Sequence, residues 1–172
     1  MFSICVALNV VISLRILQEA SMEILNLADV PQCLELISGW HHKEWGYLNP
    51  DRTLEMRLVD MHKHLEGHDI PTTFVAITDD VIGSAALIES DMPERPDLTP
   101  WLASVFVAPD ARKEGVGRAL VQRVMQHARA IGVKTMYLYT PDRSHFYKHM
   151  GWHSMEEIEY HGSSVTLMKI DL

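Results

Sequence analysis

The sequence predicts a mixed α/β domain of the α+β class, with a central mixed sheet of six to seven strands and flanking helices. Short β-branched and apolar runs separated by turn residues indicate strands, and apolar residues at helical spacing indicate helices. The two kinds of element do not alternate regularly, which argues against a doubly wound fold. The chain has 172 residues, of which 47% are hydrophobic and 22% charged, a composition that supports one sizeable core.

The N-terminal half of this domain is expected to hold one strand and two helices. A strand-like run covers residues 22–27, and Asp29 is placed to cap a helix over residues 30–45. Apolar residues recur at helical spacing over residues 53–65, and Gly67 follows as a stop signal.

Most of the sheet is expected to follow. Asp79 and Asp80 link two runs that pair as a hairpin. The strands predicted from here on cover residues 73–78, 81–89, 101–107, 134–140, 152–160 and 163–170. A strong amphipathic pattern predicts a helix over residues 115–131, and a shorter helix is expected over residues 142–149.

The first residues are treated separately. Residues 1–14 carry no charge and Arg15 follows, so the apolar run is too short to span a membrane comfortably. No positively charged region precedes it, unlike in a secretory signal. The segment is either an extra β element or an upstream extension. We expect residues 1–21 to be an extension with a non-native start, and residues 22–172 to be the domain.

Charge and cysteine content narrow the function classes. The chain has 15 Lys and Arg against 23 Asp and Glu, a net charge of −8, which argues against nucleic acid and is compatible with a cationic ligand such as an amine. Cys5 and Cys33 are the only cysteines and form no C-x-x-C pair, so neither a disulfide framework nor a thiolate zinc site is expected. A reducing compartment is consistent with this content.

The segment most informative about chemistry runs from strand 101–107 into the helix that follows. Arg112, Gly115 and Gly117 form an R-x-x-G-x-G pattern at the helix start, where unpaired N–H groups and the helix dipole favour an anion such as a phosphate. Tight packing at a helix start also explains the two glycines. A Walker A loop is disfavoured because Arg118 and Ala119 stand where a Lys-Ser/Thr pair is required, and the dinucleotide fingerprint is incomplete.

At these residues the sequence resembles the GNAT acetyltransferase superfamily. The R-x-x-G-x-G pattern is similar to its acyl-CoA-binding motif, and the segment from Phe146 through Tyr147 and Gly151 to Trp152 is similar to its aromatic-Tyr-x-x-x-Gly-aromatic segment. The predicted order of elements agrees from about residue 22 to the last residue. The resemblance implies an acyl-CoA N-acyltransferase fold and acetyl-CoA as co-substrate.

The resemblance also implies positions for the bound co-substrate. The strand 104–107 is expected to carry a bulge and to diverge from strand 134–140, with the backbone of Phe106 and Val107 binding the pantetheine arm. Pyrophosphate-binding amides are expected from Lys113, Glu114, Gly115, Val116, Gly117, Arg118 and Ala119, with charge added by Arg112 and Arg118. Many members have Asn where Thr140 stands, so the Thr140 hydroxyl is the expected substitute, and Arg143 replaces a residue that is commonly small.

Tyr147 matches the tyrosine that the family places near the sulfur of CoA. Its hydroxyl is a candidate to protonate the departing thiolate, although packing beside Phe146 and Trp152 also explains an aromatic residue here. Because an alkylamine with a pKa of about 10.4 is mostly protonated at neutral pH, a base must remove a proton. Glu89 is the leading candidate for this base, with Glu44 and His145 as alternatives, and an exposed charge closing a hairpin is the competing explanation of Glu89.

The ten histidines do not predict a metal site. His41-His42, His62-x-His64 and His145-x-x-x-His149 are the densest groups, but Phe146 stands where a zincin motif requires Glu. Solvated or hydrogen-bonded histidines explain them better. The segment from Trp40 to Trp45 is a candidate wall for the acceptor, with core packing the competing explanation of Trp40.

The sequence therefore favours an acetyltransferase that moves an acetyl group from acetyl-CoA to a primary amine of a small molecule or peptide, by direct attack in a ternary complex. The expected protein is cytoplasmic, binds neither nucleic acid nor membrane, and is compatible with the homodimer common among such folds. Two alternatives remain at this point: a non-catalytic acyl-CoA-binding sensor on the same fold, and a binder of other phosphate ligands.

Overall fold

The computed structural model describes residues 21–48, 50–67 and 69–172. The predicted extension therefore lies, apart from its last residue, outside the described residues. Within them, the predicted order of strands and helices is confirmed throughout. No helix in the described part of the chain is both long enough and apolar enough to cross a membrane.

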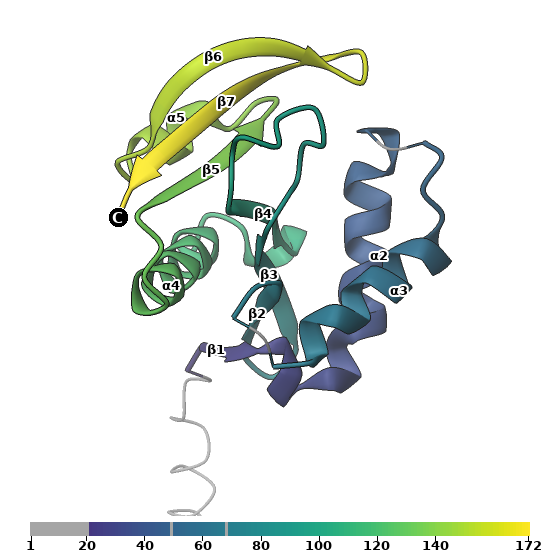
Figure 1. Cartoon of the computed structure of the whole chain (residues 1–172). Coiled ribbons are helices and arrows are strands. Elements are labelled where there is room, and N and C mark those ends of the chain that lie inside the picture. Colours follow the sequence, from purple (N-terminus) through teal and green to yellow (C-terminus); the bar gives the residue numbers. More distant parts are fainter. Residues whose placement is uncertain (1–20, 49, 68) are drawn as a thin grey trace, which may run out of the picture.

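A seven-stranded mixed sheet forms the centre of the described structure (Figure 1). Its strands are β1 (Glu23–Asn26), β2 (Thr72–Ile77), β3 (Val81–Ile88), β4 (Trp101–Val107), β5 (Thr135–Thr140), β6 (His153–Tyr160) and β7 (Ser163–Asp171). They lie in the order β1-β2-β3-β4-β5-β7-β6, and every neighbouring pair is antiparallel except β4 and β5. The mixed sheet predicted from the sequence is thus confirmed.

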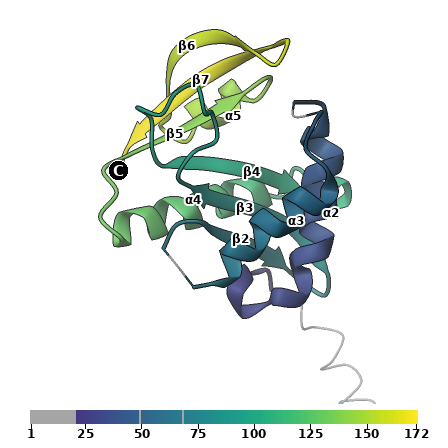
Figure 2. The same ribbon diagram turned by 45° about the vertical axis from the view of Figure 1, so that its right-hand side comes forward.

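Helices cover both faces of this sheet (Figure 2). They are α2 (Leu34–Trp45), α3 (Leu54–His62), α4 (Val116–Ala130) and α5 (Ser144–Lys148). Neighbouring residues of β2 show the two layers: Phe74 packs in the cluster that contains the apolar side of α4, whereas Val75 packs in the cluster with α2 and α3. Side chains that alternate along a strand thus build two separate cores.

The first predicted helix begins four residues later than expected, at Leu34. Residues 27–33 instead form two short 3₁₀ turns, and the Asn26 side chain, not Asp29, caps the first by accepting a hydrogen bond from the Ala28 N–H at 2.9 Å. Val30 adopts φ −133° and ψ 56°. Since Val30 precedes Pro31, the proline ring disfavours the α conformation there, which delays the continuous helix.

A loop over residues 89–100 packs against β4, β5, β6 and β7, on the face of the sheet opposite α4. Its Met92 and Leu98 are buried in a third cluster with Trp101, Tyr160 and Leu167. The Trp101 indole N–H donates to the Leu98 carbonyl at 2.7 Å, which fastens the loop to β4. The loop is therefore held over the strands that follow β4.

Strands β4 and β5 meet at one position and then part. Their only register pair in the described structure is Trp101 with Tyr137. Further along β4, the pairing with β3 shifts so that Ser104 and Val105 both lie opposite Ala85, and Ser104 has a positive φ of 52°. This is a β-bulge, which bends the strand. The bulge and the divergence expected from the family resemblance are confirmed, and they leave one backbone edge of β4 without a strand partner.

Candidate active site

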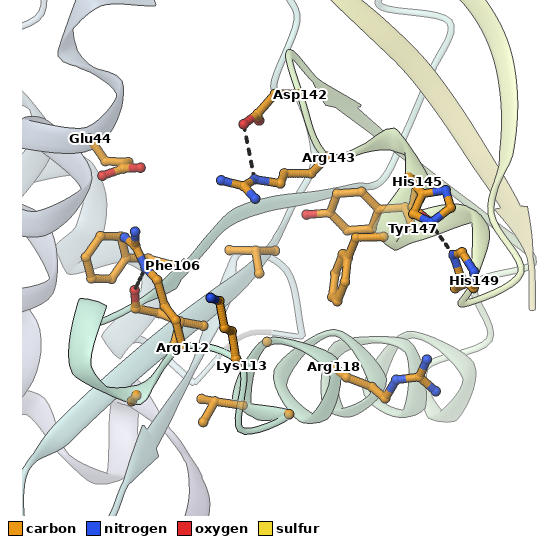
Figure 3. A pocket seen from close by; sticks show the side chains of 17 residues that line it. Glu44, Phe106, Arg112, Lys113, Arg118, Asp142, Arg143, His145, Tyr147 and His149 are labelled. Atoms are coloured by element: carbon orange, nitrogen blue, oxygen red, sulfur yellow. Dashed lines mark hydrogen bonds and ion pairs between the residues drawn. The ribbon is translucent and has the colours of Figure 1, made fainter.

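A pocket of about 790 Å³ opens beside the unpaired edge of β4 (Figure 3). It is bounded by β4, the start of α4, α5 and one residue of α2. Its lining comprises Glu44, Val105, Phe106, Val107, Ala111, Arg112, Lys113, Gly115, Val116, Gly117, Arg118, Asp142, Arg143, His145, Phe146, Tyr147 and His149. Segments far apart in the sequence thus converge on one site.

The N-terminus of α4 forms the anion-binding part of this pocket. Gly115 is its N-cap with φ +85°, and no side chain caps the helix. The first intrahelical hydrogen bond runs from the Ala119 N–H to the Gly115 carbonyl at 3.0 Å, so the amides of the first turn point out of the helix. At Gly117 a Cβ would lie 3.5 Å from Val107 Cγ2 and 3.8 Å from Phe146 Cζ, ordinary contact distances, so this part of the helix start lies close to both β4 and α5. A negatively charged group of pyrophosphate size fits these features.

Four Lys and Arg side chains line this pocket: Arg112, Lys113, Arg118 and Arg143. The Arg112 Nε donates to the Val107 carbonyl at 3.0 Å, which ties the turn before α4 to the end of β4. The Arg143 Nε lies 3.2 Å from Asp142 Oδ2 at the opposite rim. The site therefore concentrates positive charge on a chain whose net charge is −8, as a polyanionic ligand requires.

Eight of the eleven predicted cofactor-binding residues line the pocket, whereas Glu114, Ala119 and Thr140 do not. Glu114 is exposed. Thr140 is buried, and its hydroxyl accepts a hydrogen bond from the Arg143 N–H at 3.0 Å. The structure thus places the Thr140 side chain where it orders the turn between β5 and α5, from which Arg143 and Asp142 reach the pocket.

Tyr147 of α5 is buried, and its hydroxyl points into the pocket (Figure 3). Its ring packs between Phe146 and Trp152, with centroid distances of 5.0 Å and 6.1 Å. Burial is the main cause that raises the pKa of this phenol above its usual value, so the hydroxyl keeps its proton at neutral pH. The position predicted for a proton donor is therefore occupied by a protonated phenol, and the predicted packing contacts are present as well.

The candidate bases differ in position. Glu89 follows β3, is exposed and does not line the pocket, whereas Glu44 near the end of α2 and His145 on α5 both do. Glu44 lies across the pocket from Tyr147 (Figure 3). The sequence favours Glu89 because of its place at the end of a predicted hairpin strand. The sequence could not show that α2 reaches this pocket, because the approach of α2 to β4 depends on tertiary packing.

An aromatic wall joins α2 to the site. The rings of Trp40 and Trp45 contact Phe106 of β4, with centroids 4.9 Å and 6.4 Å away. Both tryptophans are half-buried. The segment considered as an acceptor wall thus lies against a pocket residue, on the α2 side of the sheet.

Two of the histidines are buried in hydrogen-bonded positions. His41 Nε2 lies 2.9 Å from the Ser84 hydroxyl, and His64 Nδ1 lies 2.9 Å from the Thr73 hydroxyl. Burial lowers the pKa of His41 to about 3 and that of His64 to about 4, so both rings are neutral. Across residues 21–48, 50–67 and 69–172, no group of three or more His, Cys, Asp or Glu side chains is placed to hold a metal ion.

The unpaired strand edge, the open helix terminus and the buried phenol together define a site of the acyl-CoA-dependent acyltransferase type. A family model described as "Acetyltransferase (GNAT) domain" matches residues 69–154, half of the chain. The protein belongs to the GNAT acetyltransferase family, whose members use acetyl-CoA. A comparison with curated proteins finds no match.

Solved structures agree with this fold. An acetyltransferase from Streptococcus agalactiae superposes with a TM-score of 0.64 at 23% identity, covering 88% of this chain and 98% of that one. A GNAT-family acetyltransferase from Streptococcus pneumoniae gives 0.65 at 15% identity, with 88% and 99% covered. The protein yncA from Salmonella typhimurium, solved with its cofactor acetyl-CoA, gives 0.65 at 19% identity, with 88% and 94% covered. At these identities the likeness concerns the fold.

Proposed function

We propose that this protein transfers the acetyl group of acetyl-CoA to a primary amine of a small molecule or peptide, by direct attack within a ternary complex. The observation that carries the proposal is that the Tyr147 hydroxyl and the open N-terminus of α4 face one pocket, beside the strand edge that β5 leaves free. In this proposal a proton donor and an anion site act on the same bound molecule.

In this proposal the pocket residues hold acetyl-CoA along its length. The amides at the start of α4 bind the pyrophosphate, and Arg112, Lys113 and Arg118 add positive charge. The free backbone edge of Phe106 and Val107 binds the pantetheine arm as a short strand would. The Val107 N–H is the proposed donor to the thioester carbonyl, whose oxygen gains negative charge during attack.

Acetyl transfer then requires two proton movements. The neutral amine nitrogen bonds to the thioester carbon, the C–S bond breaks, and the sulfur leaves as a thiolate. Tyr147 donates its hydroxyl proton to that thiolate and regains a proton from solvent. Burial keeps the phenol protonated over the working pH range, so the proton is present when the thiolate forms.

We propose Glu44, in place of Glu89, as the carboxylate that accepts the amine proton through water. Glu44 lines the pocket from the α2 side, opposite Tyr147, so a base and an acid flank the thioester position. No covalent acyl-enzyme is required, since Cys33 is buried with α2 and α3 in the core and does not line the pocket.

The test is release of free thiol from acetyl-CoA, measured against amino acids, peptides, aminoglycosides and polyamines. Polyamines belong in this panel because a structural neighbour is the spermidine/spermine N-acetyltransferase SpeG of Vibrio cholerae, although 18% identity relates the two folds only. Turnover with any amine supports the proposal. Tight acetyl-CoA binding with no turnover on the whole panel would favour a sensor instead.

The extent of the domain is a separate proposal. We propose that residues 22–172 fold and bind acetyl-CoA without residues 1–21, which agrees with the 88% of the chain that the structural neighbours cover. A chain beginning at Met22 should keep its acetyl-CoA affinity and unfolding midpoint, and loss of either would contradict the boundary. A cytoplasmic location and a homodimer stay predictions.

A further inference from the structure

A second cavity, of about 350 Å³, lies between the loop over residues 89–100 and β6. Figures 1 and 2 show this loop, which joins β3 to β4, beside the hairpin of β6 and β7. The lining residues fall within 92–95 of the loop and within 156–161 of β6 and the turn after it, and none of them lines the acetyl-CoA pocket. The proposed acetyl transfer therefore gives this cavity no role.

Alternate residues of β6 form one wall of the cavity. Glu156, Ile158 and Tyr160 are two residues apart along the strand, and side chains at this spacing point to the same face of a sheet. Ile158 and Tyr160 pack in the cluster that contains Met92 of the loop, and Met92 also lines the cavity. Glu156 is exposed and pairs with Arg95. The cavity thus has an apolar inner part and a charged rim.

Negative charge is in excess at this rim. The lining holds three glutamates, Glu94, Glu156 and Glu159, and a single arginine. Arg95 is already engaged by two carboxylates: its Nε and Nη2 each donate to Asp97 at 3.1 Å, and its Nη1 donates to Glu156. Glu94 forms no hydrogen bond or ion pair with any residue that the structure describes. A cationic ligand would therefore find an unpaired carboxylate here.

The hydroxyl of Tyr160 is a polar group without a partner on the buried wall. Tyr160 is only 7% exposed, and its ring packs on Tyr139 with centroids 5.2 Å apart. The hydroxyl makes no hydrogen bond with the described residues, yet it is not one of their fully enclosed unpaired atoms, so it opens into the cavity that Tyr160 lines. Burial raises its pKa to about 12, and the negative charges of Glu94 and Asp91 act in the same direction. The phenol is therefore neutral, with an oxygen free to accept a hydrogen bond.

These features select among ligand classes. A metal ion is disfavoured, because no three or more His, Cys, Asp or Glu side chains in the part of the chain that the structure describes are arranged to hold one. An anion would meet the excess of carboxylates. An organic ammonium ion carries N–H bonds for a carboxylate and a phenol oxygen, and its alkyl chain matches the apolar inner part.

We propose that this cavity binds a primary alkylammonium ion, whose N–H groups donate to Glu94 and to the Tyr160 hydroxyl. The alkyl chain then packs on Met92 and Ile158. The ring of His161, 4.2 Å from that of Tyr160 between centroids, completes an aromatic side for the cation. This amine site is separate from the acetyl-CoA pocket and does not depend on acetyl transfer.

Titration of the ¹⁵N-labelled protein with n-butylamine, followed by NMR without CoA, tests this site. We expect saturable shifts at the backbone amides of Glu94, Tyr160 and their neighbours. Butan-1-ol keeps the chain without the charge, and tetramethylammonium keeps the charge without an N–H. Both should bind about tenfold more weakly, as loss of charge-assisted hydrogen bonds implies. Shifts confined to the acetyl-CoA pocket, or equal affinity for either control, would overturn the assignment.

Variants locate the two contacts. Glu94→Gln and Tyr160→Phe should each weaken butylamine binding by about threefold to tenfold, as expected of a hydrogen bond to a charged group at a partly exposed site. Glu157→Gln and Tyr47→Phe make the same changes at exposed positions outside the cavity and should keep the affinity. Unchanged affinity in Glu94→Gln, or an equal loss in the controls, would contradict the site. If Tyr160→Phe does not fold, the exposed Glu94 and its control decide the question.

A free amine and a lysine side chain share this chemistry, and a parallel titration with Nα-acetyllysine amide distinguishes them. Tighter binding of n-butylamine assigns the site to a free amine, whereas equal or tighter binding of the lysine derivative assigns it to a side chain. Binding of neither overturns the proposal. Because these titrations involve no turnover, a negative result leaves the proposed acetyl transfer intact. Butylamine binding at Glu94 in a protein that releases no thiol would contradict the proposed enzyme alone.

Discussion

Trp101 of β4 and Tyr137 of β5 form the one register pair that joins these strands, and their rings lie 6.0 Å apart. Before this pair the chain runs through the loop over residues 89–100, and after it β4 and β5 separate beside the pocket. Since Trp101 has no exposed surface and donates to the Leu98 carbonyl, this position both closes the sheet and holds the loop that carries Asp91.

Trp101→Ala should therefore lower the free energy of unfolding by about 3–5 kcal/mol, through the cavity it leaves. Trp101→Phe keeps a ring but leaves the Leu98 carbonyl without its donor, so a smaller loss of about 1–3 kcal/mol is expected. Urea unfolding of the three proteins measures both values. Equal losses for the two variants would show that the hydrogen bond, rather than packing, dominates at Trp101.

Tyr147→Phe should lower kcat by about 10²-fold or more, because it removes the proposed proton donor and keeps the ring contacts with Phe146 and Trp152. The affinity for acetyl-CoA should stay within about twofold, as uniform binding is unaffected. Steady-state kinetics with a saturating acceptor and direct titration of acetyl-CoA measure the two quantities. An unchanged kcat would remove the Tyr147 hydroxyl from the chemistry.

Gly117→Glu should weaken acetyl-CoA binding by at least about 10²-fold, since it places a negative charge at the anion site. Gly117→Gln is the matched control for size, and it should lose about tenfold less. The Cβ itself is tolerated, because its nearest neighbours would lie at 3.5 Å and 3.8 Å. Calorimetric titration compares the two variants, and equal affinities would argue against a phosphate next to Gly117.

Glu44→Gln and Glu89→Gln distinguish the two carboxylates proposed as base. Glu44 lines the pocket and Glu89 does not, so kcat should fall about 10²-fold for Glu44→Gln and remain higher for Glu89→Gln. The pH profile of kcat/KM adds a second readout, since loss of the base should flatten its acidic limb. A larger loss in Glu89→Gln would return the role of base to that residue.

Asp91→Asn should stabilise the protein at neutral pH. The folded-state pKa of Asp91 is about 6 against an ordinary value of 3.8, so the folded protein holds this proton more tightly than the unfolded chain. Stability from this group is therefore present below pH 3.8 and is lost as pH rises to about 6. The Asn variant escapes this loss.

The expected gain is about 2 kcal/mol above pH 7, with little difference near pH 4, since a shift of one pKa unit corresponds to about 1.4 kcal/mol. Urea unfolding at both pH values measures it. The buried histidines His41 and His64 are common to both proteins, so the difference isolates Asp91. A gain that is equal at the two pH values would contradict a raised pKa for this carboxyl.

Local sequence signals predicted the order of elements well because each is governed by short-range physics. The stripe of apolar residues on α4 and the alternation along β5 reflect which side of an element meets the core. The start of α2 was less predictable, since Asp29 and Asn26 are both competent caps and the conformation of Val30 decided between them. Boundaries depend on such competition, whereas the identity of an element does not.

The site was predictable where a motif is contiguous. The turn from Arg112 to Gly117 lies within six residues, so the proposal of an anion site follows from the helix end that it forms. Glu44, Arg57 and Asp91 carry no such signal, because a charged residue in a helix or loop is ordinarily solvated. Glu44 stays exposed but lines the pocket because α2 approaches β4, whereas the burial of Arg57 depends on how α3 packs.

The amino-acid sequence by itself thus determined the fold family, the co-substrate and the tyrosine whose hydroxyl points into the pocket, since these depend on helix ends, strand periodicity and a contiguous motif. Only the tertiary structure decided which acidic and basic side chains line the pocket. Those side chains are brought together by contacts between residues distant along the chain, and the burial that raises the pKa of the Tyr147 phenol is likewise recorded by no local pattern.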